Sequence, residues 1–111
     1  MKRGEIWFAD LSPTVGSEIN KRRPVLIVSN DANNRAASTV TVLPITSSVE
    51  KIYPFEVALS AKASGLSKPS KALAQQIRTI SRERLSGVAH GMLDKKLMAG
   101  IDHAIRLHLS L

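Results

Sequence analysis

Short apolar runs mark the first part of the chain, and their length predicts strands rather than helices. The first run covers residues 5–10 and is ended by the turn-forming pair Ser12-Pro13. The second covers residues 24–29, is rich in β-branched side chains and has almost no polar alternation, which predicts a strand buried on both faces. About twelve residues, 11–22, separate the two runs, whereas a hairpin loop usually needs about two to five. A connection of this length in a small domain is either disordered or functional, so it is the first place to look for a site.

Further segments complete the predicted sheet. Residues 39–46 predict a third strand, in which Pro44 implies a sheet edge, a bulge or the end of the strand. Residues 55–59 alternate between apolar and polar side chains and predict a fourth strand. Residues 71–80 are ambiguous in period, and we interpret them as one or two strands.

The end of the chain is predicted to be helical. Asp94 can cap the helix, and Leu93 with Met98 has the spacing of a hydrophobic staple. Beyond the cap, apolar residues recur at steps of three and four and form one stripe: Leu97, Ile101, Ala104, Ile105 and Leu109. Residues 31–37 predict a shorter helix of one or two turns. The chain is therefore expected to be mainly β with a C-terminal helix, folded as a compact barrel or a strongly curled sheet.

The composition indicates one ordinary globular domain over residues 1–111. Apolar residues make up 43% of the chain and charged residues 23%, which excludes a disordered tail protein. The chain has no cysteine, which excludes disulfide scaffolds, thiol catalysis and thiolate metal sites and suits a reducing cytoplasm. No apolar run approaches the ~18 residues that span a membrane, and no secretory core follows the basic N-terminus. We therefore expect a cytoplasmic protein that does not contact a membrane.

Basic residues are concentrated in two places. The formal net charge is +7, and residues 51–84 hold seven basic and two acidic residues. The triplet Lys21-Arg22-Arg23 is the second concentration. Clustered positive charge is typical of a surface that binds a polyanion, either nucleic acid or an acidic protein, although a solubilising basic surface has the same composition.

No sequence pattern predicts a metal or another cofactor. The chain has three histidines, of which His103 and His108 lie about 140° apart around a helix rather than on one face. There is no His-Glu-x-x-His pattern, no acidic cluster of the EF-hand type and no phosphate-binding glycine loop. The nucleophile elbow of serine hydrolases is also absent. We therefore expect chemistry that uses no cofactor.

Polar residues lie at the ends of the predicted strands. Arg23 directly precedes the buried strand, Glu18 lies in the long connection, and Thr46 with Ser47 follows the third strand. Taken singly, each has an ordinary structural explanation, such as an arginine that binds a loop carbonyl or a turn rich in hydroxyls.

A second group of polar residues interrupts the apolar segment that follows the fourth strand. Its members are Gln75, Gln76 and Arg78. A structural explanation is available here too, because Arg78 could pair with Glu56 or Glu83 across the sheet.

Together these residues suit the cleavage of RNA without a metal. The 2′-hydroxyl of the substrate attacks the adjacent phosphate, so the enzyme must stabilise the phosphorane oxygens, accept the 2′ proton and protonate the 5′ oxygen. An arginine fork such as Arg23 binds two phosphate oxygens with fixed charge, and a hydroxyl such as that of Thr46 can hold a third. Glu18 could accept the proton. Arginine is a poor general acid because its pKa exceeds about 12, so these residues leave the proton donor unassigned.

At these same residues the sequence resembles the MazF/PemK family of toxin endoribonucleases. Each motif is short, but seven occur in the family's order and spacing over nearly the whole chain. They are Arg3-Gly4-Glu5-Ile6-Trp7, Asp10-Leu11-Ser12-Pro13, Gly16-Ser17-Glu18, Arg23-Pro24-Val25-Leu26-Ile27-Val28-Ser29, Val42-Leu43-Pro44-Ile45-Thr46-Ser47, Tyr53-Pro54-Phe55-Glu56-Val57 and Gln76-Ile77-Arg78-Thr79-Ile80.

The resemblance implies a small SH3-like barrel of the type shared by MazF and CcdB toxins, assembled as a two-fold homodimer. It implies a metal-independent endoribonuclease that cleaves single-stranded RNA, usually mRNA, at short motifs and leaves a 2′,3′-cyclic phosphate and a 5′-hydroxyl. It also implies an acidic, MazE-like antitoxin whose disordered tail would occupy the RNA groove, so that the toxin would meet DNA only indirectly, through the antitoxin. One basic surface would then serve both polyanions in turn.

Site roles follow from the positions that match the family's motifs. The resemblance implies that Arg23 stabilises the phosphorane, that Thr46 assists at the phosphate, and that Glu18 takes part, as its counterpart does in some members. Some members carry a carboxylate, proposed as a base, where this chain has Gln75, and Gln75 cannot accept a proton at neutral pH. The remaining candidates are expected to bind RNA, and the last two could equally be structural: Lys21, Arg22, Ser17, Ser47, Gln76 and Arg78.

Two other functions are compatible with the sequence. A non-catalytic toxin could poison gyrase, as relatives of this fold do, but it would have no need of the Arg23 and Thr46 pair. A nucleic-acid-binding regulator without catalysis, as a decayed toxin would be, is the second alternative. Nothing else in the sequence indicates decay, but the absence of a carboxylate at position 75 keeps this alternative open.

Overall fold

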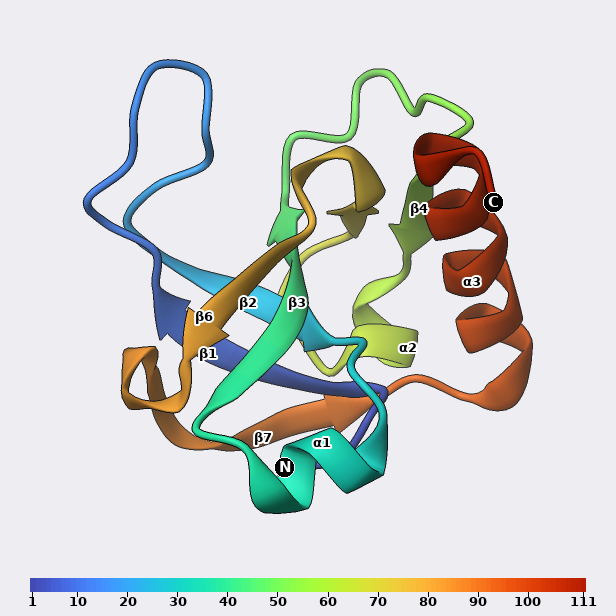
Figure 1. Cartoon of the computed structure of the whole chain (residues 1–111). Helices are drawn as coiled ribbons and strands as arrows, with labels where there is room; N and C mark the ends of the chain where they lie inside the picture. The colour runs from blue at the N-terminus through green and yellow to red at the C-terminus, as the bar shows by residue number, and fades with distance from the viewer.

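Seven antiparallel strands form one sheet in the protein, for which a computed structural model describes residues 1–111 (Figure 1). The strands are β1 (Glu5–Asp10), β2 (Arg22–Ile27), β3 (Thr39–Thr46), β4 (Glu56–Leu59), β5 (Ser70–Leu73), β6 (Arg78–Ser81) and β7 (Leu85–Met92). Hydrogen bonds join them in the order β4-β5-β3-β2-β1-β7, and β6 pairs with β3 beside β5. The helices are α1 (Asp31–Ala36), α2 (Ala61–Ser64) and α3 (Lys95–Leu109), with single 3-10 turns η1 (Ala74–Gln76) and η2 (Arg82–Arg84).

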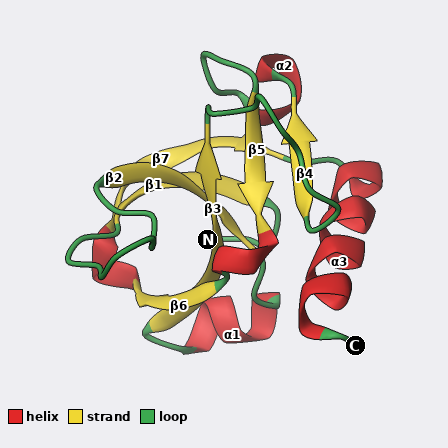
Figure 2. Cartoon of the chain, turned by 90° about the horizontal axis from the view of Figure 1, so that it is seen from above, coloured by secondary structure: helices red, strands yellow, loops and turns green.

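The sheet is strongly curled but does not close by hydrogen bonds between its two ends. Seen from above, β1, β2, β3, β6 and β7 curve around a common interior, whereas β4, β5 and α3 lie to one side (Figure 2). The strand β7 pairs only with β1, and β4 pairs only with β5. The expected mainly β fold with a C-terminal helix is confirmed, and the barrel is an open one.

The strand β3 lies at the centre because it changes partners along its length. On one side it pairs with β2, whereas on the other side Thr39–Val42 pairs with β6 and Ile45–Thr46 pairs with β5. Pro44 lies between these two stretches, where β3 has a partner only in β2. A residue without an N–H group is tolerated there. The proline therefore marks a change of partner inside a central strand rather than the edge, bulge or strand end that we expected.

Two hydrophobic clusters lie on opposite faces of β2. Leu26 belongs to the cluster that packs under α3, and Val25 and Ile27 belong to the cluster inside the curled strands; all three are 0% exposed. Because successive side chains of a strand point to opposite faces, a strand between two clusters must be apolar at every position. The predicted burial of this strand on both faces is confirmed.

The C-terminal helix begins and packs as its pattern predicts. The side chain of Asp94 accepts a hydrogen bond from the Leu97 N–H at 2.8 Å, and Leu93 and Met98 are both buried beside this cap. Ile101 and Ala104 complete the buried stripe. The stripe then leaves the core, and three leucines are exposed at the end of the chain: Leu107 and Leu109 in the last turn of α3, and Leu111 two residues beyond it. The helix has 15 residues, and no helix of the chain combines the length and apolar character that crossing a membrane demands.

The remaining expectations were confirmed in part. Residues 71–80 hold two strands, β5 and β6, separated by η1, and α1 forms where a short helix was predicted. The sequence reading missed α2 and β7, whose residues have no clear apolar alternation. The alternation in residues 55–59 also did not predict which side chains of β4 are buried. Glu56 is buried although it is charged, and Ala58 is exposed although it is apolar.

Candidate functional site

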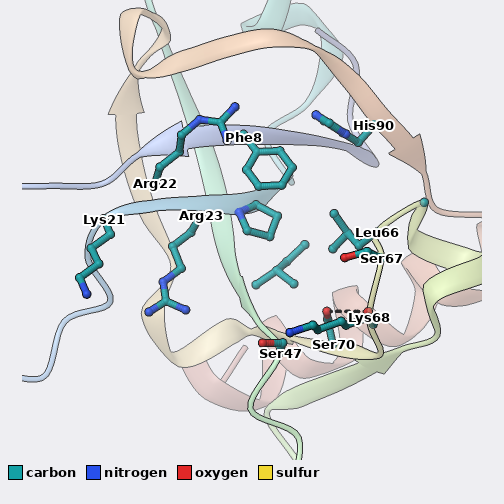
Figure 3. A pocket seen from close by; sticks show the side chains of 13 residues that line it. Phe8, Lys21, Arg22, Arg23, Ser47, Leu66, Ser67, Lys68, Ser70 and His90 are labelled. Carbon is teal, nitrogen blue, oxygen red and sulfur yellow. Dashed lines mark hydrogen bonds between the residues drawn. The ribbon is translucent and has the colours of Figure 1, made fainter.

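A cationic pocket of about 560 Å3 opens beside the start of β2 (Figure 3). Its walls come from β1, β2, β7, the end of β3 and the loop between α2 and β5. Four of its lining side chains are cations, and none of the lining residues is acidic: the cations are Lys21, Arg22, Arg23 and Lys68. A concave surface with this charge attracts and concentrates anionic ligands.

Arg23 presents a free fork to this pocket. Its Nε donates to the carbonyl of Asn20 at 3.1 Å, which fixes the side chain against the end of the long connection. Its two terminal nitrogens make no hydrogen bond within the protein. Because a guanidinium binds two phosphate oxygens in a planar, bidentate arrangement, the two free nitrogens suit a phosphate ligand.

The neighbouring residue, Arg22, is held in a different way. Its guanidinium carbon lies 4.5 Å from the centroid of the Phe8 ring, and its Nη2 donates to Ser86 Oγ at 3.4 Å. Figure 3 shows Arg22 turned towards Phe8 and Arg23 turned away from it, as expected for adjacent residues of an extended strand. The two arginines therefore serve two parts of one pocket.

Lys21 adopts a backbone conformation that is unusual for a residue with a side chain. Its φ is 68°, in the left-handed region. Its N–H donates to Ser12 Oγ at 2.9 Å, and its carbonyl accepts from the Leu11 N–H at 3.0 Å. These two bonds close the base of the 11–21 loop and hold the strained residue at the mouth of the pocket. Strain of this kind is often found at functional sites.

Thr46 and Ser47 lie at the end of β3, next to the same pocket. Val25 of β2 pairs with Pro44 of β3, so the same register continued by two residues places Arg23 across from Thr46. Ser47 lines the pocket, whereas Thr46 does not. The Oγ1 atom of Thr46 accepts a hydrogen bond from the Ser48 N–H at 3.2 Å. The ends of β2 and β3 thus lie side by side, and the joint role of Arg23 and Thr46 at the phosphate stays a prediction.

The other candidates lie around a second, separate pocket of about 370 Å3, lined by Ser17, Glu18, Gln75, Gln76, Ile77 and Arg78. There Gln76 Oε1 accepts from the Ile19 N–H at 2.9 Å, and its Nε2 donates to the Ser17 carbonyl at 3.2 Å. Arg78 Nη1 donates to the Leu11 carbonyl at 3.2 Å. Gln76 and Arg78 therefore fasten the 11–21 loop at both ends, and Arg78 pairs with neither Glu56 nor Glu83.

Glu18 is exposed in that loop and serves its local geometry. Its Oε1 accepts a hydrogen bond from the Val15 N–H at 2.7 Å. Glu18 lines the second pocket and not the one that holds Arg23. The candidate residues therefore line two pockets, one with Arg23 and one with Gln76 and Arg78. Glu18 belongs to the second pocket and lies in the 11–21 loop.

A buried ion pair between Glu56 and Lys71 joins the strands β4 and β5, outside the cationic pocket. Glu56 accepts hydrogen bonds from Lys71 Nζ at 2.8 Å, from the Tyr53 N–H at 3.0 Å and from Gln75 Nε2 at 2.6 Å. Burial raises the pKa of Glu56, but these three donors and the charge of Lys71 together outweigh burial and hold the pKa below its ordinary value. Gln75, which replaces a carboxylate of some relatives, thus donates to a carboxylate here.

Several residues that line the cationic pocket with Arg23, called the main pocket below, were not predicted from the sequence. Phe8, Leu66, Lys68 and His90 all line it. Lys68 belongs to the basic stretch 51–84, which was the only signal for this wall of the pocket. No three side chains among the histidines and acidic residues lie close enough together to hold a metal ion.

Comparison with known proteins gives the same family from sequence and from structure. A sequence model of PemK-like, MazF-like toxins of type II toxin–antitoxin systems matches residues 2–109. Endoribonuclease MazF9 of Mycobacterium tuberculosis is 47% identical over 116 residues, which cover 100% of this chain and 98% of the relative. Endoribonuclease EndoA of Bacillus subtilis is 42% identical over 113 residues, which cover 100% of this chain and 96% of the relative.

The fold comparison agrees. A solved endoribonuclease in complex with its cognate antitoxin, from a mycobacterial species, superposes with a TM-score of 0.81 at 27% identity and covers 100% of this chain and 96% of that one. The motifs around Arg23 and Thr46, the open curled sheet with its C-terminal helix and the match over residues 2–109 lead to one conclusion. The chain belongs to the family of PemK-like, MazF-like toxins of type II toxin–antitoxin systems.

Proposed function

We propose that this endoribonuclease toxin binds single-stranded RNA, chiefly mRNA, in the cationic pocket and cleaves it at the phosphate that Arg23 holds. The observation that carries the proposal is the pair of unbonded terminal nitrogens of Arg23, in a pocket lined by four cations and no carboxylate. A phosphodiester would neutralise this charge and satisfy the fork at the same time.

The cleavage is an internal transfer of the phosphoryl group. The 2′-oxygen of the substrate attacks phosphorus, and the bond from phosphorus to the 5′-oxygen breaks. The departing 5′-oxygen takes a proton from solvent, so the products are a 2′,3′-cyclic phosphate and a 5′-hydroxyl. Arg23 stabilises the charge on the phosphorane oxygens, and Thr46 contributes a hydroxyl at the same phosphate. Glu18 is the proposed acceptor of the 2′ proton, and one of its carboxylate oxygens is free of internal hydrogen bonds. Because Glu18 lines the second pocket, this role requires the 11–21 loop to bring it to the phosphate. No step needs a metal or another cofactor.

The same surface suits an acidic partner. We propose that an acidic, MazE-like antitoxin occupies the cationic pocket and competes with RNA, and that contact with DNA is indirect, through that antitoxin. The relative that was solved with its cognate antitoxin supports this assignment. The exposed leucines at the C-terminal end of the chain support assembly as a homodimer: Leu107, Leu109 and Leu111. An mRNA substrate places the activity in the cytoplasm.

A cleavage assay on a long unstructured RNA in excess EDTA tests the proposal. The wild type should yield discrete fragments that end in a cyclic phosphate, and Arg23→Ala should yield none while remaining folded. Arg35→Ala is the matched control, because it removes the same charge from an exposed position on α1. Fragments in EDTA that Arg23→Ala produces at the wild-type rate would overturn the role of Arg23. Intact RNA from folded, antitoxin-free protein would overturn cleavage itself and direct the next experiment to gyrase.

A further inference from the structure

We propose that the part of the pocket bounded by Phe8, His90 and Leu66 is a subsite for one nucleobase of the RNA, next to the phosphate held by Arg23. The identity of the ligand rests on the proposed function. The subsite itself rests on three features of the structure: an aromatic surface, a bulged strand that brings His90 to it, and a loop fixed against that strand by two glycines.

The aromatic surface is formed by Phe8 and His90. Their ring centroids are 4.6 Å apart in an edge-to-face arrangement, and both rings line the pocket. Arg22 covers the Phe8 ring at 4.5 Å, so a planar cation lies beside two planar rings. Unpaired bases stack on aromatic side chains and on arginine planes, and each base has such a face whatever its sequence. A phosphate alone would have no use for this surface.

The backbone of β7 departs from regular pairing to place His90 there. Ile6 of β1 pairs with Gly91, but Phe8, two residues later, pairs with Ser86, so β7 contains extra residues between these points. Gly87 lies in this bulge with a φ of 76°, which favours glycine. Bulges of this kind redirect side chains next to functional sites. Here the bulge brings the imidazole of His90 against Phe8.

The wall next to His90 is fixed by contact between the backbone of the loop that joins α2 to β5 and the backbone of β7. A Cβ atom on Gly65 would lie 2.4 Å from the His90 carbonyl oxygen, and one on Gly91 would lie 2.2 Å from the Ser64 carbonyl oxygen. Only glycines allow the loop to approach β7 so closely. The loop then holds Leu66 and Ser67 on the same side of the pocket as His90, next to Phe8 (Figure 3).

The subsite therefore has an apolar floor and a polar edge. Leu66 is half-buried, whereas Ser67 and His90 are exposed to the pocket and offer a hydroxyl and an imidazole. Groups of both kinds can form hydrogen bonds with the edge of a base that lies flat against Phe8. Arg23 then holds the phosphate, and this subsite selects the base beside it.

Ligand binding tests the subsite without relying on cleavage. The probes are the four nucleoside 5′-monophosphates and ribose 5-phosphate, which has no base, and the signal is the NMR shift of the His90 ring protons. At least one nucleotide should shift these protons and bind roughly 5- to 100-fold more tightly than ribose 5-phosphate, which is the range that stacking one base provides. His90→Ala and Phe8→Leu should lose this advantage, whereas His103→Ala, an exposed histidine of α3, should keep it.

Sequencing the ends of cleaved RNA gives the second measurement. His90→Ala should relax the base preference at one position next to the cut, whereas Arg23→Ala should lose cleavage at every site. Nucleotides that bind no more tightly than ribose 5-phosphate would overturn the subsite. So would a wild-type cleavage motif that both His90→Ala and Phe8→Leu retain, and in that case the ribonuclease assignment would stand. A wild type that cleaves no RNA but binds a nucleotide through His90 would overturn the proposed function and uphold the subsite.

Discussion

Glu56 Oε1 and Lys71 Nζ lie 2.8 Å apart between the paired strands β4 and β5, and both side chains are almost fully buried. Lys71 Nζ also donates to the Lys51 carbonyl at 2.6 Å, which fastens the segment after β3. Through Gln75 the same carboxylate holds η1, whose last residue, Gln76, fastens the 11–21 loop. One ion pair therefore fixes the two segments that flank Arg23, although neither of its members lines the main pocket.

Removing the charge of Glu56 should destabilise the protein. A buried pair that loses one partner leaves an uncompensated charge, so Glu56→Gln should lower the free energy of unfolding by about 3 kcal/mol at pH 7. Denaturant unfolding gives this value. Glu83→Gln, at an exposed position, is the control and should change it by less than about 0.5 kcal/mol. Equal stability of the two variants would contradict the role given to the pair.

The same pair should make stability depend on pH. Because the pKa of Glu56 is lower in the folded protein than in the unfolded chain, the carboxylate contributes stability that is fully present above the unfolded pKa of about 4.3. That contribution is lost as the pH falls through the folded pKa. Unfolding free energies measured between pH 7 and pH 3 should fall more steeply for the wild type than for Glu56→Gln. Parallel curves would show that Glu56 titrates with its ordinary pKa.

Gln76 should control the order of the 11–21 loop. Gln76→Ala removes both bonds to the loop, so the Ile19 amide should exchange hydrogen faster and cleavage should decline. Gln76→Glu keeps an oxygen for the Ile19 N–H and loses only the donor to the Ser17 carbonyl, so it should keep Ile19 protected. Hydrogen exchange followed by NMR measures both. Unchanged protection of Ile19 in Gln76→Ala would show that the loop is held by its other anchors.

The sequence predicts the part of the pocket around Arg23 better than the part around Phe8 and His90, for a physical reason. Arg23 and Ser47 line the same pocket because each lies at the end of an apolar strand, and the ends of paired strands share an edge. His90 reaches Phe8 through a bulge in β7, and no alternation of side chains marks that strand. Glu56 shows the same limit, since its burial depends on Lys71, which arrives from another strand. Local patterns predict elements, whereas these contacts depend on pairing between distant segments.

Arg23→Lys should separate charge from geometry. Lysine keeps the positive charge but loses the planar fork, so RNA binding should change little while the cleavage rate falls by about 100-fold or more, as expected when a transition-state donor is lost. Single-turnover cleavage and binding of RNA methylated at its 2′ oxygens measure the two effects separately. A lysine variant that cleaves at the wild-type rate would show that Arg23 contributes charge alone.

Lys68 should bind phosphate without reading sequence. For single strands, each neutralised phosphate contributes about 0.7 to the slope of log affinity against log salt, so Lys68→Ala should lower the slope by roughly that amount. The loss should be equal for RNAs of different sequence. Lys96→Ala, in the exposed first turn of α3, is the control with the same change of charge and should leave the slope unchanged. A sequence-dependent loss in Lys68→Ala would instead place that side chain at a base.

The contact between Gly91 and Ser64 should be as important for the pocket as the side chains that line it. A Cβ on Gly91 would meet the Ser64 carbonyl at 2.2 Å, so Gly91→Ala must push the loop off β7. Forcing an extra methyl group into packed structure costs about 1–3 kcal/mol, and the shift should also weaken nucleotide binding.

Gly100→Ala is the control, because it adds the same methyl group but should stabilise the protein rather than destabilise it. It lies inside α3 with open space around its Cβ position, so alanine should stabilise the helix by about 0.5–1 kcal/mol and leave binding unchanged. Thermal unfolding and nucleotide titration of both variants test this, and equal effects of the two substitutions would show that the close approach of the loop to β7 has no role in forming the pocket.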